Sequence, residues 1–461
     1  MLTANKLQSI NPATNEVLGE VPVSSPEEIR AAVAAARKAQ PEWQALGTEG
    51  RVEVLRRLAD DFTAHRDKLA RLITLEMGRP LEANLKAVDG TLKTVRWNLD
   101  NAAAILAPET TFEDAKELHQ IYYEPFGVYG VIAPWNYPFS NFTMTALQPL
   151  LAGNTVVYKL SEEVPLFGEM LNESFARAKV PSGVFTQVFG GGETGEALAR
   201  SDIDHLHFTG STAVGQKLYK IAAEKFIPIT LELGGSDAGI VFEDADIDRM
   251  IEPIFWAKFV NSGQRCCALK RLFVHHSRYD ELVAKLTDFI KKQKTGNPLD
   301  KDTALGPLVS KKQRQLLAAQ VEDAVNKGVK VLLGGDTKSA GEGAYFEPTL
   351  LADLKPDMRA SHEELFGPVL PIASFKTEEE AIHLANDTCY GLSAFIYTQD
   401  PTRAKRVAAQ LQAGSVSHNG VDYFKAPNPF GGYKHSGMGR TGGKAGLQNC
   451  CQIKVVAMEK L

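Results

Sequence analysis

The chain has 461 residues, 44% of them hydrophobic and 23% charged, which suits two or three globular domains and excludes a disordered or collagen-like protein. A formal net charge of -5 leaves no basic excess to attract a nucleic-acid backbone or a membrane surface. The five cysteines, an odd number with two adjacent pairs, are not typical of a disulfide framework and favour a reducing cytoplasm.

The first quarter of the chain is predicted to be mostly helical. Ser25, Pro26 and Glu28 form the pattern of a helix N-terminus with a capping box. Further helices are expected at 52–65 and 69–77, where apolar residues recur every three or four positions. No basic stretch followed by a long apolar run opens the chain, and no apolar run is long enough for a bilayer, so neither a signal peptide nor a membrane span is expected.

Strand-like and helix-like segments alternate from about residue 127 onward. The first series of predicted strands lies at 128–134, 154–159, 184–189, 205–210, 228–235 and 238–242. A second series of strands and helices runs from 271 to 416. This alternation predicts parallel strands with crossover helices, and therefore two doubly wound α/β domains.

Two carboxyl-terminal segments differ from this pattern. Glycine and proline cluster at 428–443, which predicts a long loop. The tail at 451–461 is predicted to be an exposed strand. Its free edge could pair with another subunit.

The most informative short segment is Asn-Ser-Gly-Gln-Arg-Cys-Cys at 261–267. Cys266 follows a glycine turn and Arg265, so its thiol could be exposed with a lowered pKa, as a nucleophile requires. The alternative is that Cys266 and Cys267 are two small buried residues. For an isolated cysteine pair this alternative is the more common one, because free cysteine is among the most buried residue types.

Two other polar residues lie at the ends of predicted strands. Glu232 is set in an apolar run before two glycines, where burial would raise its pKa and make it a general base. Its alternative role is a helix cap or an ion-pair partner. Asn136, in Pro-Trp-Asn-Tyr-Pro, could donate its amide to an oxyanion. Its alternative role is a proline-bounded turn in which Asn136 binds its own backbone.

The glycine-rich segments and the histidines give weaker signals. The segment 190–195 lacks the lysine and hydroxyl of a phosphate loop, whereas 210–215 follows a strand and opens a helix whose amides could face a pyrophosphate. Any strand-to-helix turn can have this form. His275 and His276 lack zinc-site spacing to the cysteines, so no metal is expected, and no serine-hydrolase motif is present.

Taken in order, these segments resemble the aldehyde dehydrogenase superfamily over nearly the whole chain, closest to its succinate-semialdehyde dehydrogenase-like members. The separation of Glu232 and Cys266, 34 residues, is similar to the family's spacing of base and nucleophile. The ordered motifs that carry the resemblance are INPATNEVLGEV, LEMGRP, PWNYP, VVYKLSEEVP, FTGSTAVG, LELGG, NSGQRCC, EELFGPV and PFGGYKHSGMGR.

The resemblance implies a catalytic set. Cys266 would be the nucleophile, with Cys267 a bystander, and Glu232 the general base. Asn136 would form the oxyanion hole together with the backbone N–H of Cys266. The implied reaction oxidises an aldehyde to a carboxylic acid through a cysteine thiohemiacetal and a thioester.

The resemblance also implies a dinucleotide cofactor, NAD with NADP possible. Because the carboxylate of Glu162 would repel the extra phosphate of NADP, NAD is expected to be preferred. Lys159 and Glu162 would hold the adenosine ribose, Ser211 the pyrophosphate and Glu364 the nicotinamide ribose. The other implied cofactor residues are Trp135, Leu233 and Phe366.

The substrate is less well defined by these motifs. Succinate-semialdehyde dehydrogenases usually carry arginines that bind the substrate carboxylate, at positions where this chain has Met144 and Val260. Both replacements are apolar and favour an uncharged aldehyde, although Lys425, His435 or Arg265 could still supply a positive charge. Succinate semialdehyde or a related small aldehyde is the expected substrate.

Three rival functions are considered. A coenzyme A-acylating dehydrogenase would need no water-activating carboxylate, so Glu232 counts against it. A non-catalytic protein that retains the fold would need neither Cys266 nor Asn136. An alcohol dehydrogenase or plain reductase has no use for a nucleophilic cysteine.

The family architecture implies three parts. The cofactor domain would comprise 1–110 and 124–231, and the catalytic domain 232–435. The segments 111–123 and 436–461 would form a β-extension that joins subunits. The expected partners are a small aldehyde and further copies of the chain, in a cytoplasmic homodimer or homotetramer, with no nucleic acid and no membrane.

Overall fold

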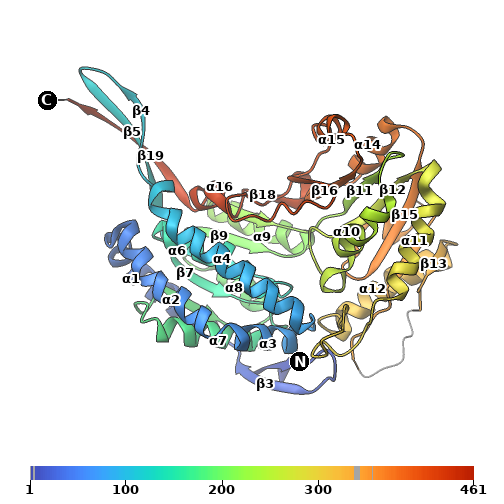
Figure 1. Cartoon of the computed structure of the whole chain (residues 1–461). Helices are drawn as coiled ribbons and strands as arrows, with labels where there is room; N and C mark the ends of the chain where they lie inside the picture. Colours follow the sequence, from blue (N-terminus) through green and yellow to red (C-terminus); the bar gives the residue numbers. More distant parts are fainter. Residues whose placement is uncertain (1, 4–5, 337–342, 356, 461) are drawn as a thin grey trace.

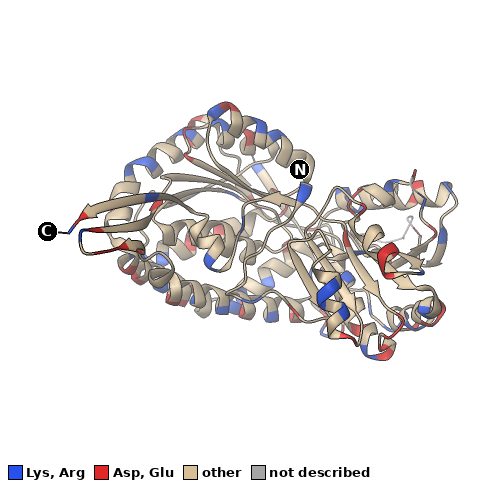
Figure 2. Ribbon diagram, turned by 90° about the horizontal axis from the view of Figure 1, so that it is seen from above, with Lys and Arg blue, Asp and Glu red and all other residues tan. Residues whose placement is uncertain are grey.

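The computed structural model describes residues 2–3, 6–336, 343–355 and 357–460. Two α/β bodies lie side by side, and a narrow β-ribbon extends from one of them (Figure 1). Lys and Arg alternate with Asp and Glu along the outer helices, as expected for a nearly balanced charge (Figure 2). Within the described ranges, no helix combines the length and the apolarity that a membrane crossing needs.

The amino-terminal helices begin and end where the sequence predicts. Ser25 Oγ accepts the N–H of Glu28 at 3.2 Å, and the Glu28 carboxylate accepts the N–H of Ser25 at 2.7 Å, which completes the capping box. Gly78 ends the third helix with a left-handed φ of 86°. The bounds are α1 Pro26–Ala45, α2 Gly47–Ala64, α3 Arg66–Met77 and α4 Leu81–Ile105.

A small antiparallel sheet precedes these helices and was not predicted from the sequence. Ser9 in its second strand donates its hydroxyl to the buried Glu76 of α3 at 2.7 Å. Glu76 also accepts the N–H groups of Leu166 and Phe167, at 2.8 Å each. The carboxylate therefore ties the sheet, α3 and the start of α7 together. The strands are β1 Leu2–Thr3, β2 Lys6–Ile10 and β3 Val17–Pro22.

The first large sheet confirms the predicted parallel α/β pattern. Its strand order is β18-β10-β9-β6-β7-β8, parallel except for the short antiparallel edge strand β18. Its strands are β6 Val128–Ile132, β7 Thr155–Lys159, β8 Phe185–Val188, β9 His205–Thr209, β10 Ile229–Glu232 and β18 Gly437–Met438. The associated helices are α5 Pro138–Phe142, the π-helix η1 Thr143–Leu147, α6 Gln148–Ala152, α7 Pro165–Arg177, α8 Gly192–Arg200 and α9 Thr212–Lys225.

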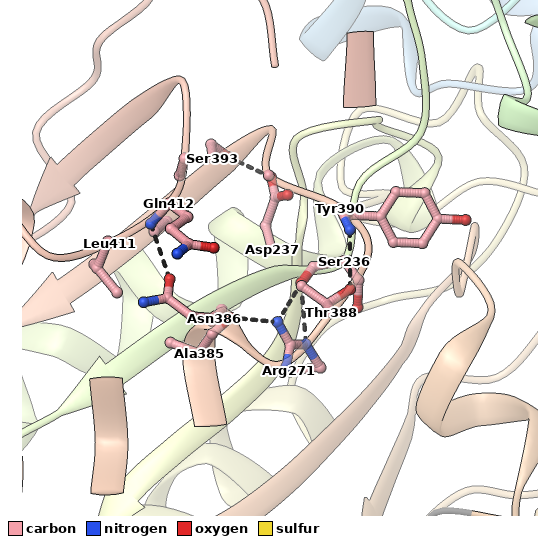
Figure 3. A pocket seen from close by; sticks show the side chains of 14 residues that line it. Ser236, Asp237, Arg271, Ala385, Asn386, Thr388, Tyr390, Ser393, Leu411 and Gln412 are labelled. Carbon is pink, nitrogen blue, oxygen red and sulfur yellow. Dashed lines mark hydrogen bonds between the residues drawn. The ribbon is translucent and has the colours of Figure 1, made fainter. Parts of the chain in front are cut away.

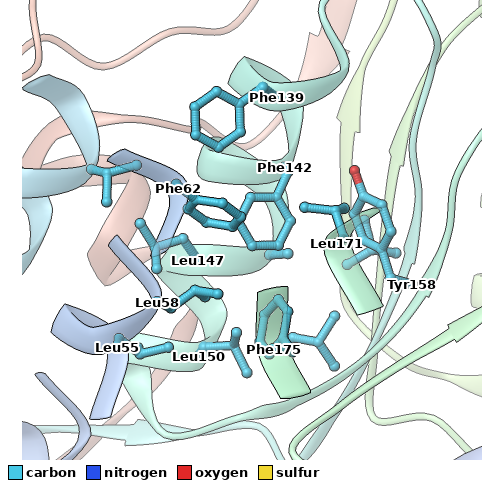
Figure 4. Close-up of a cluster of buried hydrophobic side chains, with 14 of the residues drawn as sticks. Leu55, Leu58, Phe62, Phe139, Phe142, Leu147, Leu150, Tyr158, Leu171 and Phe175 are labelled. Carbon is cyan, nitrogen blue, oxygen red and sulfur yellow. The ribbon is translucent and has the colours of Figure 1, made fainter. Parts of the chain in front are cut away.

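An aromatic core fixes the helices against one face of this sheet (Figure 4). The Phe62 ring of α2 meets those of Phe139 and Phe142 edge to face, with centroids 5.0 and 5.8 Å apart. Phe175 of α7 stacks on Phe185 of β8 at 4.0 Å. Because this core locks α5, the segment just before α5, which carries Asn136, is held in place.

The second large sheet has the strand order β13-β14-β15-β12-β11-β16-β17 and is parallel except for its edge strand β13. Its strands are β11 Asp237–Val241, β12 Leu269–His275, β13 Lys330–Leu333, β14 Thr349–Ala352, β15 Val369–Phe375, β16 Ser393–Tyr397 and β17 Ser415–His418. Its helical segments are α10 Ile247–Phe259, η2 Val260–Gly263, η3 His276–Arg278, α11 Tyr279–Lys291, α12 Lys311–Asn326, α13 Arg359–His362, α14 Glu378–Asn386 and α15 Pro401–Ala408.

The carboxyl-terminal part returns to the first body before it leaves in the ribbon. The segment 428–443 is not only a loop, because it contains the short helix η4 Lys434–Ser436 and strand β18, which pairs with β10. Helix α16 Gly443–Gln448 then packs on α4 and α6. The predicted tail strand is β19 Cys451–Glu459, and it pairs antiparallel with β5 Glu117–Pro125, which pairs with β4 Glu109–Glu113.

Candidate active site

A cavity of about 680 Å³ lies between the two bodies, at the carboxyl ends of β6, β9 and β10. Ligands of open α/β sheets bind at this edge. Most of the residues singled out from the sequence line this one cavity. They are Trp135, Asn136, Ser211, Glu232, Leu233, Cys266, Glu364 and Phe366.

The loop that carries the two cysteines has an unusual backbone. Asn261, Ser262 and Gly263 have φ values of 54, 52 and 77°, a left-handed run that costs conformational energy at the two non-glycine residues. Side-chain hydrogen bonds compensate, since Ser262 Oγ donates to the carbonyl of Gly306 at 2.7 Å. Gln264 Oε1 likewise accepts the N–H of Val309 at 2.8 Å. The loop is thus anchored at two points just before the nucleophile candidate.

Asn136 is tied to this loop and not to its own backbone. Its Nδ2 donates to the carbonyl of Gln264 at 3.2 Å, and its Oδ1 accepts from Asn141 Nδ2 at 3.3 Å. Its own carbonyl accepts from Asn261 Nδ2 at 3.1 Å. The side-chain amide is 7% exposed and faces the cavity next to Cys266. An amide fixed in this way can donate to an oxyanion without reorganisation.

The two thiols differ from the sequence expectation. Cys266 is half-buried and reaches the cavity, whereas Cys267 is buried. The hydrogen bond with Cys267, followed by burial, raises the pKa of Cys266 above its usual range. Although burial opposes it, the hydrogen bond from Cys266 and the charge of Arg265 lower the pKa of Cys267 to about 5.

The pKa of Cys266 is therefore raised and not lowered, contrary to the expectation from the sequence. Arg265 Nε donates to Cys267 Sγ at 3.0 Å, so the arginine acts on the neighbouring thiol and not on Cys266. The two thiols ionise as a pair whose singly charged form Arg265 stabilises. The opposite shifts, raised at Cys266 and lowered at Cys267, favour the first ionisation of the pair at Cys267.

Glu232 is the last residue of β10 and is 4% exposed. Neither of its carboxyl oxygens has a hydrogen-bond partner, so it is neither a helix cap nor part of an ion pair. Burial raises the pKa of Glu232 well above its ordinary value, although the charge of Arg440 opposes this. This is the direction that the sequence predicts for a general base.

Glu364, at the other side of the cavity, is held firmly. Its Oε1 accepts from Lys270 Nζ at 3.0 Å and from the N–H of Gly235 at 3.2 Å. Lys270 also donates to the carbonyls of Arg265 and Cys266. One buried lysine therefore positions both Glu364 and the cysteine loop. The sequence analysis missed it, although a lysine at the start of an apolar strand was a usable signal.

The structure offers a surface that fits a dinucleotide. Ser211 precedes the fourteen-residue helix α9 and makes no side-chain capping bond, so the first N–H groups of α9 remain available to an anion. A Cβ on Gly215 would lie 2.5 Å from Leu233, which shows how closely α9 approaches β10. The rings of Trp135 and Phe366 meet edge to face at 5.6 Å and form a wall of the cavity.

Lys159 and Glu162 lie beyond this wall and are not part of the cavity lining. They pair with each other, Lys159 Nζ to Glu162 Oε2, at 3.1 Å. Charge from Lys159 lowers the pKa of Glu162, although burial opposes it. Other cavity residues were not foreseen from the sequence, because their places depend on loop packing: Arg79, Gln313, Tyr423, Phe424 and Thr441.

A second cavity of about 20 Å³ lies behind Asp237 (Figure 3). Arg271 lines this cavity and donates to the carbonyls of Ser236, Leu384 and Ala385. The remaining space holds about one water molecule. The hydrogen bonds of Arg271 therefore stabilise this end of the sheet, and the cavity is too small for a substrate.

A cysteine thiol, an amide donor and an unpaired carboxylate share one cavity with a helix N-terminus, a combination typical of enzymes that use a thiol nucleophile and a nucleotide cofactor. Residues 2–456 match the aldehyde dehydrogenase family. The chain is 37% identical to the succinate-semialdehyde dehydrogenase GabD of Escherichia coli (strain K12), named for NADP(+), across 99% of this chain and 96% of that protein. It is 38% identical to the glutarate-semialdehyde dehydrogenase of Pseudomonas aeruginosa, across 97% and 93%.

Solved structures agree with these relatives. An NAD+ complex of aldehyde dehydrogenase from Bacillus cereus superposes with a TM-score of 0.95 at 36% identity, covering 98% of this chain and 93% of that one. The chain belongs to the aldehyde dehydrogenase family. It is an NAD(P)-dependent oxidoreductase that converts an aldehyde to a carboxylic acid.

Proposed function

We propose that Cys266 is the nucleophile of this reaction and that Asn136 forms the oxyanion hole. Transfer of the Cys266 proton to Cys267, whose charge Arg265 holds, makes the attacking sulfur a thiolate. When the sulfur adds to the aldehyde carbon, the new alkoxide accepts from Asn136 Nδ2 and from the backbone N–H of Cys266. The chemistry that NAD(P) supplies when bound is acceptance of the hydride from this carbon.

Glu232 serves as the general base for the second half of the reaction. Its unpartnered carboxylate takes a proton from a water molecule, which then attacks the thioester on Cys266 and releases the acid. Because no other group neutralises Glu232, its raised pKa makes it a stronger base than an exposed glutamate. The observation that carries the proposal is the meeting of Cys266, Asn136 and Glu232 in one cavity.

The test is an assay of the full chain with small aldehydes and NAD or NADP, followed by absorbance of the reduced nicotinamide. Cys266→Ser should lose turnover, and Cys389→Ser, a control at an exposed cysteine outside the cavity lining, should retain most of it. Undiminished turnover in Cys266→Ser would support a non-catalytic or different role. Formation of an acyl-coenzyme A in the presence of free coenzyme A would instead favour the acylating alternative.

The remaining cofactor contacts follow from the lining of the cavity. Ser211 and the start of α9 would hold the pyrophosphate, and Glu364 would hold the nicotinamide ribose between Trp135, Leu233 and Phe366. Lys159 and Glu162 would hold the adenosine ribose. These roles come from the paired geometry of Lys159 and Glu162 and from the family.

NAD is the preferred cofactor in this proposal, since the Glu162 carboxylate repels the extra phosphate of NADP. The relative from Escherichia coli is named for NADP(+), so the cofactor preference of this chain has to be measured with both cofactors. Glu162→Gln should lower the ratio of kcat/KM for NAD over NADP about tenfold, which corresponds to about 1.4 kcal/mol. Glu163→Gln, which changes the neighbouring carboxylate bonded to Ser310 Oγ at 3.2 Å, should leave the ratio unchanged.

The substrate is succinate semialdehyde or a related small aldehyde. Met144 and Val260 line the cavity and give it an apolar wall, which suits the methylene chain of such a substrate. The named relatives that act on succinate and glutarate semialdehydes support this choice. Initial rates with these two compounds and with butanal and benzaldehyde would rank the candidates.

The domain roles and the assembly are part of the same proposal. The cofactor domain comprises 1–110 and 124–231, the catalytic domain 232–435, and the extension 111–123 with 436–461. The ribbon of β4, β5 and β19, whose Ile453 and Val455 are 65% and 64% exposed, would pair with another copy in a cytoplasmic homodimer or homotetramer. Light scattering on the purified chain would give the copy number.

A further inference from the structure

Two arginines line the active-site cavity without an acidic partner. Arg79 follows α3, is 9% exposed, and its buried Nε has no hydrogen-bond partner. Arg265 directly precedes the nucleophile, and its Nε donates to Cys267 Sγ. Neither guanidinium takes part in any of the ion pairs found among the described residues. Arg265 faces the Cys267 sulfur, but Arg79 is a buried positive charge without a counter-ion, which is costly and needs an explanation.

Aromatic rings cover these guanidinium groups. The Cζ of Arg79 lies 5.0 Å from the centre of the Tyr137 ring, and that of Arg265 lies 4.7 Å from the Phe424 ring. This contact offsets part of the cost of burial. It uses the flat faces of the groups, so apart from Arg265 Nε the N–H donors at their edges can bind a bidentate partner.

The two arginines both interact electrostatically with Tyr137. Burial and the charge of Arg265 lower the pKa of Arg79, and the Tyr137 hydroxyl interacts electrostatically with both guanidinium groups. Tyr137 directly follows Asn136, the proposed oxyanion donor. An anion bound by the arginines would therefore share one cavity with Cys266 and Asn136.

The acidic residues that line the cavity form no ion pair with Arg79 or Arg265. Glu364 pairs with Lys270, and Asp422 pairs with Lys425 at 3.5 Å on the exposed rim. Glu232 is buried at the end of β10, where Arg440 is the charged group that opposes its raised pKa. None of these carboxylates neutralises Arg79 or Arg265. Because the Cys267 sulfur can balance only Arg265, this part of the cavity keeps an uncompensated positive charge.

We infer that Arg79 and Arg265 form a carboxylate-binding subsite, and that the substrate is an aldehyde with a carboxylate at its far end. The inference rests on the proposed function and deepens it. It places the positive charge on residues other than positions 144 and 260, where this chain has Met and Val. The expectation of an uncharged aldehyde, drawn from those two positions alone, is replaced by a semialdehyde of an acid.

The test compares kcat/KM for succinate semialdehyde with kcat/KM for butanal, which has the same carbon count and no carboxylate. Arg79→Gln should lose about 10- to 100-fold with the semialdehyde, mainly through KM, and change less than about threefold with butanal. Arg265→Gln should show the same selective loss on top of any common loss from its contact with Cys267. Arg79→Lys should recover part of the semialdehyde activity.

Lys425→Gln is the matched control, because it removes an exposed positive charge at the rim of the same cavity. It should affect the two substrates equally. Equal losses for both substrates in Arg79→Gln, or a selective loss only in Lys425→Gln, would overturn the subsite. Oxidation of butanal but no preference for the semialdehyde would refute the inference and leave the proposed function intact, whereas no oxidation of any aldehyde would refute the proposed function itself.

A second measurement needs no variant and covers the case in which Arg79→Gln does not fold. Succinate should inhibit butanal oxidation by the wild-type enzyme competitively, and succinamide, its uncharged analogue, should not. Inhibition of similar strength by both compounds, or by neither, would contradict a carboxylate subsite.

Discussion

Two buried glutamates in different regions show how this chain treats a carboxyl group. Glu76, at the junction of the amino-terminal sheet, α3 and α7, accepts three hydrogen bonds and supports packing. Glu232, at the cavity, accepts none. Burial raises the pKa of both, to about 7 for Glu76 even with its three donors and well above the ordinary value for Glu232.

The difference teaches that burial alone does not mark a functional carboxylate. Buried polar groups normally find partners, and those that do not are often part of a reaction. The partnered glutamate stabilises the fold, whereas the unpartnered one keeps its lone pairs free for a proton. Lys270 belongs with the partnered groups, because all of its observed contacts hold neighbouring atoms in place.

The largest effect is expected from Glu232→Gln. Loss of the general base should lower kcat about 10²- to 10⁴-fold, while the first turnover still forms the thioester. A rapid burst of reduced nicotinamide followed by a very slow steady state, with the acyl group on Cys266 detected by mass spectrometry, would show this. Glu76→Gln, the matched control, should hydrolyse its thioester at the wild-type rate. Loss of the burst in Glu232→Gln would break the comparison.

Lys270→Met should have the next largest effect. It leaves Glu364 without its cation and removes the donor to the carbonyls of Arg265 and Cys266, which should cost about 3–5 kcal/mol of unfolding free energy. Lys285, which forms ion pairs with Asp248 and Glu281 on the surface, provides the control, and Lys285→Met should cost less than about 1 kcal/mol. Denaturant titrations of both variants measure the difference, and similar costs would argue against a positioning role.

Glu76→Gln should cost about 1–3 kcal/mol of unfolding free energy, because an amide oxygen cannot replace both carboxyl oxygens as acceptors. The raised pKa sets the sign of the pH dependence. The folded state holds the Glu76 proton more tightly than the unfolded state, so the wild-type free energy of unfolding falls as pH rises from about 4.3 to about 7. Unfolding at pH 5 and pH 8 should show this decrease in the wild type and a smaller one in Glu76→Gln.

The smallest of these effects is a shift in the pH profile of turnover. Because the pKa of Glu232 is raised, the acid form persists above the ordinary glutamate range and the base form appears only as pH rises. Steady-state kcat should therefore rise with pH in a limb that lies above about pH 4.3. The limb should be absent from the residual steady-state rate of Glu232→Gln. An identical limb in that variant would assign it to another group.

Much of the fold could be predicted from sequence because its signals are local. The capping box at Ser25 and the alternation of apolar strands with amphipathic helices each depend on a few neighbouring residues. The strands before α1 and the pairing of β18 with β10 were missed, since both depend on contacts with distant segments.

In the candidate site, too, the residues in local motifs could be predicted, whereas contacts between distant segments could not. Cys266, Asn136 and Glu232 lie in short recognisable motifs, and the structure brings them to one cavity. That Arg79 reaches the same cavity as Arg265 depends on packing between segments almost two hundred positions apart. Nothing in the local sequence encodes such a meeting.

The left-handed turn at 261–263 has a consequence for biogenesis. A side chain at Gly263 would lie 2.2 Å from the carbonyl oxygen of Gly367, and Ser262 binds Gly306, so the turn closes only against segments synthesised later. The backbone geometry of the loop that carries Cys266 can therefore form only after the segments with Gly306 and Gly367 have been synthesised and have folded against it.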